Sequence, residues 1–263
     1  MGAGGPSDAG RATGRAWDEI LPLLRDPATN APPRADELAA RVAPAGWLDF
    51  VGADAAERPI GQGLCMQAPW VSRIYDGLWR PFFFTVFARQ LVNADQEAFL
   101  LQRLLEGRGP VVDLSCGPGT FAGRLHAQPA LRPVLGVDLS PSMLDEAARA
   151  APGPYYVRGD AYDLPLRDES VAGVVNAGAF HLYPDPRGVL REVRRVLAPG
   201  GVFVLLAFVT ISTALARLVR PIEHSVGLTR WSVDEIVTLI EEAGYSSVEP
   251  FRFGGRATFR AVK

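Results

Sequence analysis

A short apolar strand that runs directly into a glycine turn constrains this chain more than any other part of its sequence. Residues 111–120 read Val-Val-Asp-Leu-Ser-Cys-Gly-Pro-Gly-Thr, so Asp113 closes the strand, and Gly117 and Gly119 lead toward a helix. Glycine permits left-handed backbone conformations and lets a ligand approach with no side chain in between. The turn is typical of nucleotide-type binding loops, and an ordinary strand-to-helix turn is the alternative.

Apolar runs alternate with helical segments along the second half of the chain. The runs cover residues 111–114, 134–138, 155–157, 171–176 and 202–209. The segments between them, such as 142–150 and 187–197, have helical periodicity. This alternation predicts an α/β fold with a Rossmann-like, mainly parallel seven-stranded sheet and helices on both faces. After a helix over 232–243, the extended runs 248–253 and 258–262 predict an antiparallel C-terminal strand pair.

The first 69 residues differ in composition from the rest. Residues 1–33 are rich in glycine, alanine and proline, which predicts disorder interrupted by one short helix near residues 16–24. We therefore expect a partly disordered N-terminal extension over 1–69. The main domain is expected over 70–263, with helical lid elements at 70–105 and 211–230.

Charge and cysteine content narrow the classes of partner. A formal net charge of −2 and an isoelectric point near 6.0 give no basic field, so we expect no nucleic-acid partner. No apolar run is long enough for a membrane span. Cys65 and Cys116 have no metal-ligand spacing, so we expect no metal. These features favour a cytoplasmic protein with a small-molecule substrate.

In open α/β sheets, ligands bind at the carboxyl ends of the strands. We therefore expect the residues that follow four of the predicted strands to form one site. These residues are 113–119, Asp138 with Leu139, Asp160 with Ala161, and 176–181.

Two carboxylates have a specific expected role in that site. Asp138 follows Gly119 by about 20 residues, the separation at which a carboxylate at the end of the second strand accepts hydrogen bonds from ribose hydroxyls. The alternative is a helix cap, because Ser140 and Pro141 begin a helix directly afterwards. Asp160 is expected to accept from an adenine amino group, with a solvated turn as the alternative.

These residues resemble the class I S-adenosylmethionine-dependent methyltransferases over about residues 75–263. Asp-Leu-Ser-Cys-Gly-Pro-Gly-Thr at 113–120 is similar to the family's first motif, and residues 136–144 are similar to its second-strand motif. The adenine, fourth-strand and fifth-strand motifs follow in the family's order, at 159–165, 176–181 and 192–204. Ser115 departs from the family, which most often has a glycine there.

The resemblance implies S-adenosylmethionine as the cofactor and S-adenosylhomocysteine as the product. NAD is disfavoured, because a dinucleotide turn calls for Gly-x-Gly-x-x-Gly. The implied cofactor-binding residues are Tyr75, Asp113, Ser115, Gly117, Gly119, Asp138, Leu139, Met143, Asp160, Ala161, Asn176 and Ala177. The chain also resembles the ubiquinone/menaquinone-methyltransferase subgroup, on residues 74–81, 113–117 and 177–181.

Aromatic residues suggest an apolar acceptor pocket under a lid, although the aromatic stretch 70–91 is equally typical of a core helix. The candidates for the pocket are Trp79, Phe83, Phe180, Tyr183 and His224. Methyl transfer requires chiefly alignment of the acceptor, and a base only where the acceptor carries a proton of high pKa. His181 is the candidate catalytic base, and packing against the adenine or the substrate without proton transfer is the alternative.

We therefore expect an enzyme that transfers a methyl group from S-adenosylmethionine to a small hydrophobic acceptor. A polyketide, a quinone or a phenol in natural-product biosynthesis fits this expectation. The alternative is a methyltransferase-fold cyclase that keeps S-adenosylmethionine as a structural cofactor, since cyclisation depends mainly on confinement of the substrate. A non-catalytic binding role is a third reading.

Overall fold

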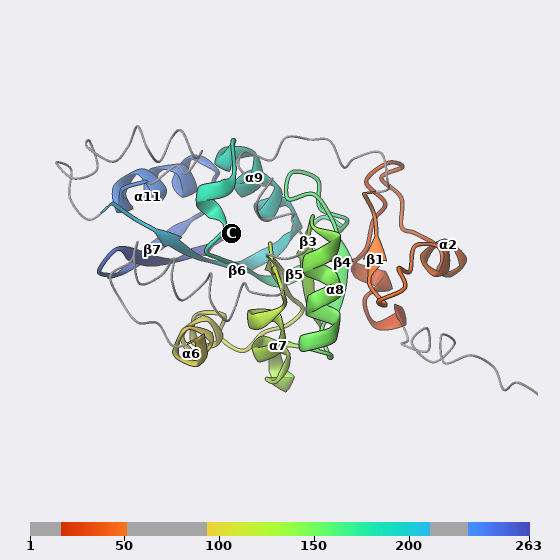
Figure 1. Cartoon of the computed structure of the whole chain (residues 1–263). Coiled ribbons are helices and arrows are strands. Elements are labelled where there is room, and N and C mark those ends of the chain that lie inside the picture. The colour runs from red at the N-terminus through yellow and green to blue at the C-terminus, as the bar shows by residue number, and fades with distance from the viewer. Residues whose placement is uncertain (1–16, 52–93, 211–230) are drawn as a thin grey trace, which may run out of the picture.

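The structure is a computed structural model, and it describes residues 17–51, 94–210 and 231–263 (Figure 1). Four residues predicted for the site, Tyr75, Trp79, Phe83 and His224, lie outside these ranges. So do the expected domain boundary at residue 69, the second lid element and most of the first. In the part of the chain that the structure describes, no helix is long and apolar enough to cross a membrane.

The sheet has the predicted α/β architecture, in the order β1-β4-β3-β2-β5-β6-β8-β7. Its parallel strands are β1 (Leu48–Asp49), β4 (Tyr155–Arg158), β3 (Val134–Asp138), β2 (Val111–Leu114), β5 (Val171–Ala177) and β6 (Leu197–Phe208). The strands β8 (Arg256–Val262) and β7 (Ser247–Phe253) pair antiparallel, as predicted. The central strands β2 and β4 are buried along their whole length, which is typical of parallel sheets covered on both faces.

Within the residues that the structure describes, the sheet has eight strands, one more than the seven predicted. The additional strand is β1, which pairs in parallel with β4 through Leu48 beside Val157 and Asp49 beside Arg158. A strand of two residues has no hydrophobic alternation, so the sequence pattern does not reveal it.

Helices cover both faces of the sheet (Figure 1). The helices α9 (Pro186–Val196) and α11 (Val233–Glu242) pack on one face, and α6 (Ala94–Leu104), α7 (Thr120–His126) and α8 (Pro141–Ala150) pack on the other. Local sequence fixes where they begin. In α8 the Ser140 hydroxyl accepts from the Met143 amide at 3.4 Å, and in α11 Ser232 and Glu235 form a capping box.

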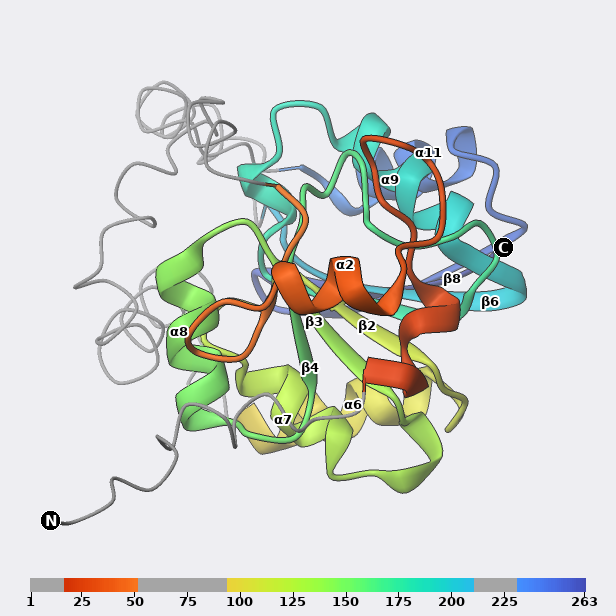
Figure 2. The same cartoon turned by 90° about the vertical axis from the view of Figure 1, so that its right-hand side faces the viewer.

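Residues 17–51 pack against the same core as the main sheet. They contain the 3-10 turns η1 (Trp17–Glu19) and η2 (Leu21–Leu23), the helix α2 (Ala35–Ala40) and strand β1. The side chains of Ile20, Leu24 and Leu48 are fully buried and belong to the same core cluster as the buried side chains of α9 and α11. Figures 1 and 2 place this segment, in red and orange, at the β4 side of the sheet. We call residues 17–51 the N-terminal strap.

Two further 3-10 turns lie close to the sheet. They are η5 (Pro129–Leu131), which precedes β3, and η6 (Phe180–Leu182), which follows β5. The turn η6 carries His181, so it brings the predicted catalytic residue to the carboxyl end of β5.

Candidate active site

The turn after β2 depends on left-handed backbone. Ser115, Gly117 and Gly119 have φ angles of +57°, +53° and +80°, and Gly119 is the N-cap of α7. A Cβ atom at Gly119 would lie 2.6 Å from the hydroxyl oxygen of Tyr156, whereas one at Gly117 would have nothing within 4 Å. Gly119 is therefore required for packing, and Gly117 leaves space beside the turn. The positive φ of Ser115 is a conformation that glycine would adopt without strain.

Asp138 connects this turn to the end of β3. Its Oδ2 accepts from the Gly117 amide at 2.8 Å, and its Oδ1 accepts from the Ser140 amide at 2.9 Å. Burial raises the pKa of Asp138, and the hydrogen bonds from the amides of Ser140, Gly117 and Leu139 oppose this. The N-cap of α8 is Ser140 and not Asp138. Because a carboxylate has about four acceptor positions, Asp138 keeps capacity for further donors.

Asp113 is a buried acid at the end of β2, with an exposed fraction of 1%. Burial raises the pKa of Asp113 to about 7; a hydrogen bond from the Ala122 backbone opposes the rise, and the charge of Asp138 adds to it. Its Oδ2 accepts no hydrogen bond from the described residues. An unsatisfied buried carboxylate oxygen is costly, so a donor or a positive charge at this edge of the sheet would be strongly favoured.

A polar cluster joins the ends of β2 and β5. The Asn176 amide nitrogen donates to the Leu114 carbonyl at 3.0 Å and to the Tyr183 hydroxyl at 2.8 Å. The Tyr183 hydroxyl in turn lies 2.7 Å from the Ser115 hydroxyl. Burial raises the pKa of Tyr183, so its phenol stays protonated at neutral pH. Asn176 also has an amide oxygen that is buried without a hydrogen-bond partner among the described residues.

The turn after β4 lies directly beside Asp138. The Gly159 amide donates to the Asp138 carbonyl at 3.1 Å, and this contact holds the ends of β3 and β4 together. Asp160 follows, with its Oδ1 accepting from the Tyr162 amide at 2.9 Å. The Asp163 amide donates to the Asp160 carbonyl at 3.1 Å, closing a tight turn around Ala161.

The η6 turn places two predicted residues in the interior. Phe180 is 1% exposed and belongs to the core, and its ring meets Tyr183 edge-to-face at 6.4 Å between centroids. His181 is buried too, with its ring 5.3 Å from that of Phe208. The role of His181 as a base, or as a residue that packs against the adenine or the substrate, stays a prediction.

The remaining predicted residues lie at the same edge of the sheet. Leu139 follows Asp138, Met143 is buried on α8, and Ala177 ends β5. The predicted residues within the described ranges thus come together at the carboxyl ends of four neighbouring strands, β4, β3, β2 and β5.

The sequence did not identify Arg158, the buried last residue of β4. Its Nε donates to the Leu139 carbonyl at 3.1 Å, and its Nη1 contacts Asp49 of β1 at 3.2 Å. The arginine itself could have indicated these contacts, because a charged residue at the end of a buried apolar strand needs hydrogen-bonding or charged partners.

Part of this chain is similar in sequence to a known domain family, and its fold is shared with solved structures. Residues 112–205, which include β2 to β5 and most of β6, match the model of a methyltransferase domain family. Residues 112–205 are therefore similar to a methyltransferase domain. The fold is shared with a solved S-adenosylmethionine-dependent methyltransferase of Thermotoga maritima, described as a possible histamine N-methyltransferase. The TM-score is 0.56 and the identity 23%, with 73% of this chain and 98% of that one covered.

Curated proteins that are similar to this chain include proteins from a plant and from mycobacteria. An uncharacterised chloroplastic methyltransferase of Arabidopsis thaliana is 28% identical over 200 residues, which is 70% of this chain and 55% of the relative. The phthiotriol/phenolphthiotriol dimycocerosates methyltransferase of Mycobacterium tuberculosis is 42% identical over 99 residues, or 37% of each chain. The matched part thus spans about half or less of the length of these relatives.

Proposed function

We propose that this protein is an S-adenosylmethionine-dependent methyltransferase whose cofactor binds across the carboxyl ends of β4, β3, β2 and β5. One observation carries the proposal. Acceptors at this edge exceed the available donors, since Oδ2 of Asp113 and the amide oxygen of Asn176 are buried without a partner among the described residues. S-adenosylmethionine offers donors of the matching kind in its ammonium, ribose hydroxyls and adenine amino group, so the residues present fit this cofactor.

The strand order suggests how these acceptors divide the cofactor between them. Asp160 and Ala161, after β4, would face the adenine, and Asp138, after β3, would accept from the ribose hydroxyls. Asp113 of β2 and Asn176 of β5 lie beyond Asp138 in the sheet, where the positively charged methionine end would follow. A positive charge there would lower the raised pKa of Asp113.

The cofactor supplies an already activated methyl group on a positively charged sulfur. The protein's task is then to hold the acceptor in line and to exclude water, an effect worth up to about 7–11 kcal/mol in ideal cases. Tyr183 stays protonated, and its hydroxyl accepts from the Asn176 amide nitrogen and can donate to the Ser115 hydroxyl, so it orients both side chains. His181 would take a proton only from an acceptor of high pKa, and its packing on Phe208 also suits a purely positioning role.

We further propose a small hydrophobic acceptor from natural-product biosynthesis, such as a polyketide, and membership of the ubiquinone/menaquinone-type subgroup. Aromatic side chains that follow β5 support the first point, since Phe180 packs edge-to-face on Tyr183 and Phe208 packs on the ring of His181. The mycobacterial relative, which is named for dimycocerosates, is consistent with it. Residues 74–81 carry much of the subgroup resemblance.

Binding calorimetry tests the cofactor half of this proposal. The purified protein should bind S-adenosylmethionine and S-adenosylhomocysteine, and an absence of affinity for both at millimolar concentration would overturn the proposal. The reaction is tested by accurate mass after incubation with a panel of polyketides and phenols. Methyl transfer adds one CH₂ to the product, whereas a product of unchanged mass would identify the cyclase alternative.

A further inference from the structure

The N-terminal strap pairs with the connection between β4 and β5. The Arg25 amide donates to the Pro165 carbonyl at 3.2 Å, and the Arg167 amide donates to the Leu23 carbonyl at 2.8 Å. Leu24 and Leu166 form the antiparallel bridge between these bonds, and both side chains are fully buried. The strap is therefore continuous with the core at the segment that leads away from Asp160 and Ala161.

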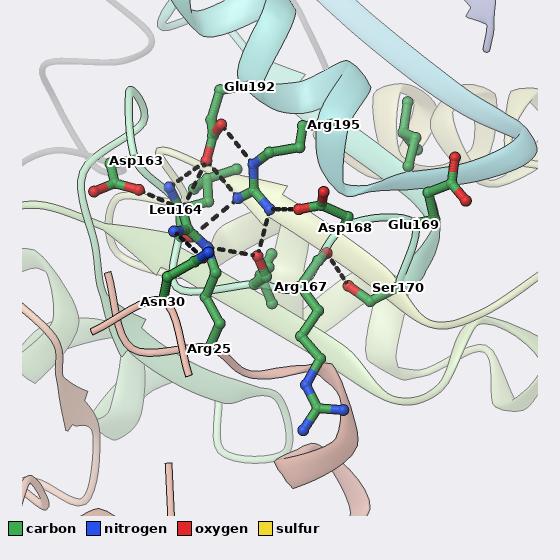
Figure 3. A network of polar contacts seen from close by, with 12 residues as sticks. Arg25, Asn30, Asp163, Leu164, Arg167, Asp168, Glu169, Ser170, Glu192 and Arg195 are labelled. Carbon is green, nitrogen blue, oxygen red and sulfur yellow. Dashed lines mark hydrogen bonds and ion pairs between the residues drawn. The ribbon is translucent and has the colours of Figure 1, made fainter. Parts of the chain in front are cut away.

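Arg25 extends this pairing with its side chain, which is 13% exposed. Its guanidinium donates to the Asp163 carboxylate, to the Leu164 carbonyl at 3.1 Å and to the Leu166 carbonyl at 3.2 Å. Figure 3 shows the Arg25 guanidinium beside Asp163 and Leu164 of the loop. One side chain of the strap thus binds three groups of the β4–β5 loop through charge-assisted hydrogen bonds.

Helix α9 holds the same loop from the other side (Figure 3). The Glu192 carboxylate accepts from the Leu164 amide at 2.6 Å and lies 3.6 Å from Arg25. Arg195 donates to the Leu166 carbonyl at 2.8 Å and to Glu192 at 2.6 Å. The backbone of the loop is therefore fixed by two arginines and a glutamate, which replace the ladder hydrogen bonds that a strand would make.

The loop transmits this restraint to Asp160. Asp163, the carboxylate partner of Arg25, bonds through its backbone to the Asp160 carbonyl at 3.1 Å. A short turn of this kind has little freedom, so the position of Asp163 determines that of Asp160 and Ala161. In the proposed function these two residues face the adenine.

A second contact of the strap reaches the neighbouring turn. Asp49 of β1 pairs with the buried Arg158 at 3.2 Å, and Arg158 donates to the Leu139 carbonyl directly after Asp138. The Phe50 amide also donates to the Arg158 carbonyl at 3.1 Å. The strap therefore contacts Asp163 and Arg158, which hold in place the two turns that would bind the nucleoside.

We propose that Arg25 is a positioning residue for the adenine end of the cofactor site, and that the N-terminal strap is a part of that site. The proposal rests on the proposed function for the identity of the ligand. The effect of Arg25 on the β4–β5 loop does not depend on the ligand, because Arg25 holds this loop in place even in the free protein.

Arg25→Met tests the proposal, since it keeps the apolar stem of the side chain and removes all of its donors. Arg260→Met is the matched control. Arg260 of β8 is 15% exposed, donates to the Leu104 carbonyl and pairs with Glu106, so it fixes α6 to the sheet away from the cofactor turns. Arg25→Lys, which restores one charged group, provides a second variant if Arg25→Met does not fold.

Two measurements are compared for all the proteins. Calorimetry gives the affinity for S-adenosylhomocysteine and for its inosine analogue, which lacks the adenine amino group. Hydrogen exchange gives the protection of the amides of residues 160–167 without ligand. Arg25→Met should weaken S-adenosylhomocysteine binding roughly 2- to 30-fold, reduce the preference over the inosine analogue and accelerate exchange in the loop. Arg25→Lys should recover part of each loss, and Arg260→Met should change neither the preference nor the loop exchange.

The outcomes separate this proposal from the proposed function. If the wild-type protein binds neither ligand while Arg25→Met accelerates exchange in the loop, the cofactor assignment fails, and with it the adenine role of Arg25. If the wild-type protein binds and Arg25→Met retains wild-type affinity, preference and exchange, only the Arg25 proposal is overturned. An equal loss of affinity in Arg25→Met and Arg260→Met, with an unchanged preference in both, would also overturn it.

Discussion

Replacing Asp113 by asparagine should remove a pH-dependent penalty from the folded protein. Burial raises the pKa of Asp113 from 3.8 to about 7. The folded-state pKa lies above the unfolded value, so protonation of Asp113 stabilises the folded protein. This stabilisation is complete below pH 3.8 and is lost as the pH rises through about 7. At about 1.4 kcal/mol per pKa unit, the complete loss amounts to about 4 kcal/mol. Between pH 5 and pH 8 it amounts to roughly 2.5 kcal/mol.

Urea unfolding, followed by tryptophan fluorescence at several pH values, measures this effect. The difference in unfolding free energy between Asp113→Asn and wild type should grow in favour of the variant from pH 5 to pH 8. Asp168→Asn is the control, because Arg195 holds the pKa of Asp168 below its usual value and no such trend is expected in this range. A difference for Asp113→Asn that stays constant with pH would refute the reasoning.

The same carboxyl should make cofactor affinity depend on pH. A bound cation stabilises the ionised form of Asp113, so the wild-type protein should bind S-adenosylmethionine more weakly as the pH falls below about 7. Calorimetry at pH 5.5, 6.5 and 7.5 compares the two proteins, and the slope should be smaller in Asp113→Asn. An identical slope would show that the cofactor's charge does not act on this carboxyl.

Three further substitutions test the framework of the site. Gly119→Ala should cost about 1–2 kcal/mol through its left-handed φ alone, with more from the contact with Tyr156, and thermal unfolding of the free protein measures it. Tyr183→Phe should lower the unfolding free energy by about 0.5–1.5 kcal/mol and weaken cofactor binding, because it removes the hydroxyl group that joins Ser115 to Asn176. Unchanged stability and affinity would contradict this role of the hydroxyl group. Leu24→Ala should cost about 2–5 kcal/mol in urea unfolding, whereas a strap that contributes nothing to the core would lose less than about 0.5 kcal/mol.

The sequence predicted the central strands closely for a simple physical reason. The strands β2 and β3 are buried on both faces, so each is a continuous apolar run, and turn or capping residues mark where the run ends. The same runs placed Asp113, Asp138, Asp160 and Asn176 at one edge of the sheet, because parallel strands end on the same side.

Contacts between distant parts of the chain were not predictable in this way. Arg25 and Asp163 are separated by 138 positions, and nothing in the local pattern of either residue indicates the other. Tyr183 was assigned to the substrate pocket for its aromatic ring, while its hydroxyl group joins Ser115 to Asn176. The contacts of Arg25 and of the Tyr183 hydroxyl are tertiary hydrogen bonds. They depend on how the helices and strands pack, and they produce no periodic pattern in the sequence.

Asp138 provides the most direct test of the account's central claim, that the carboxyl ends of these strands hold S-adenosylmethionine. Calorimetric titration with S-adenosylhomocysteine compares the wild-type protein with Asp138→Ala. We expect one cofactor per chain and a loss of about 1–3 kcal/mol of binding free energy in the variant. Equal affinity in the two proteins would contradict the claim.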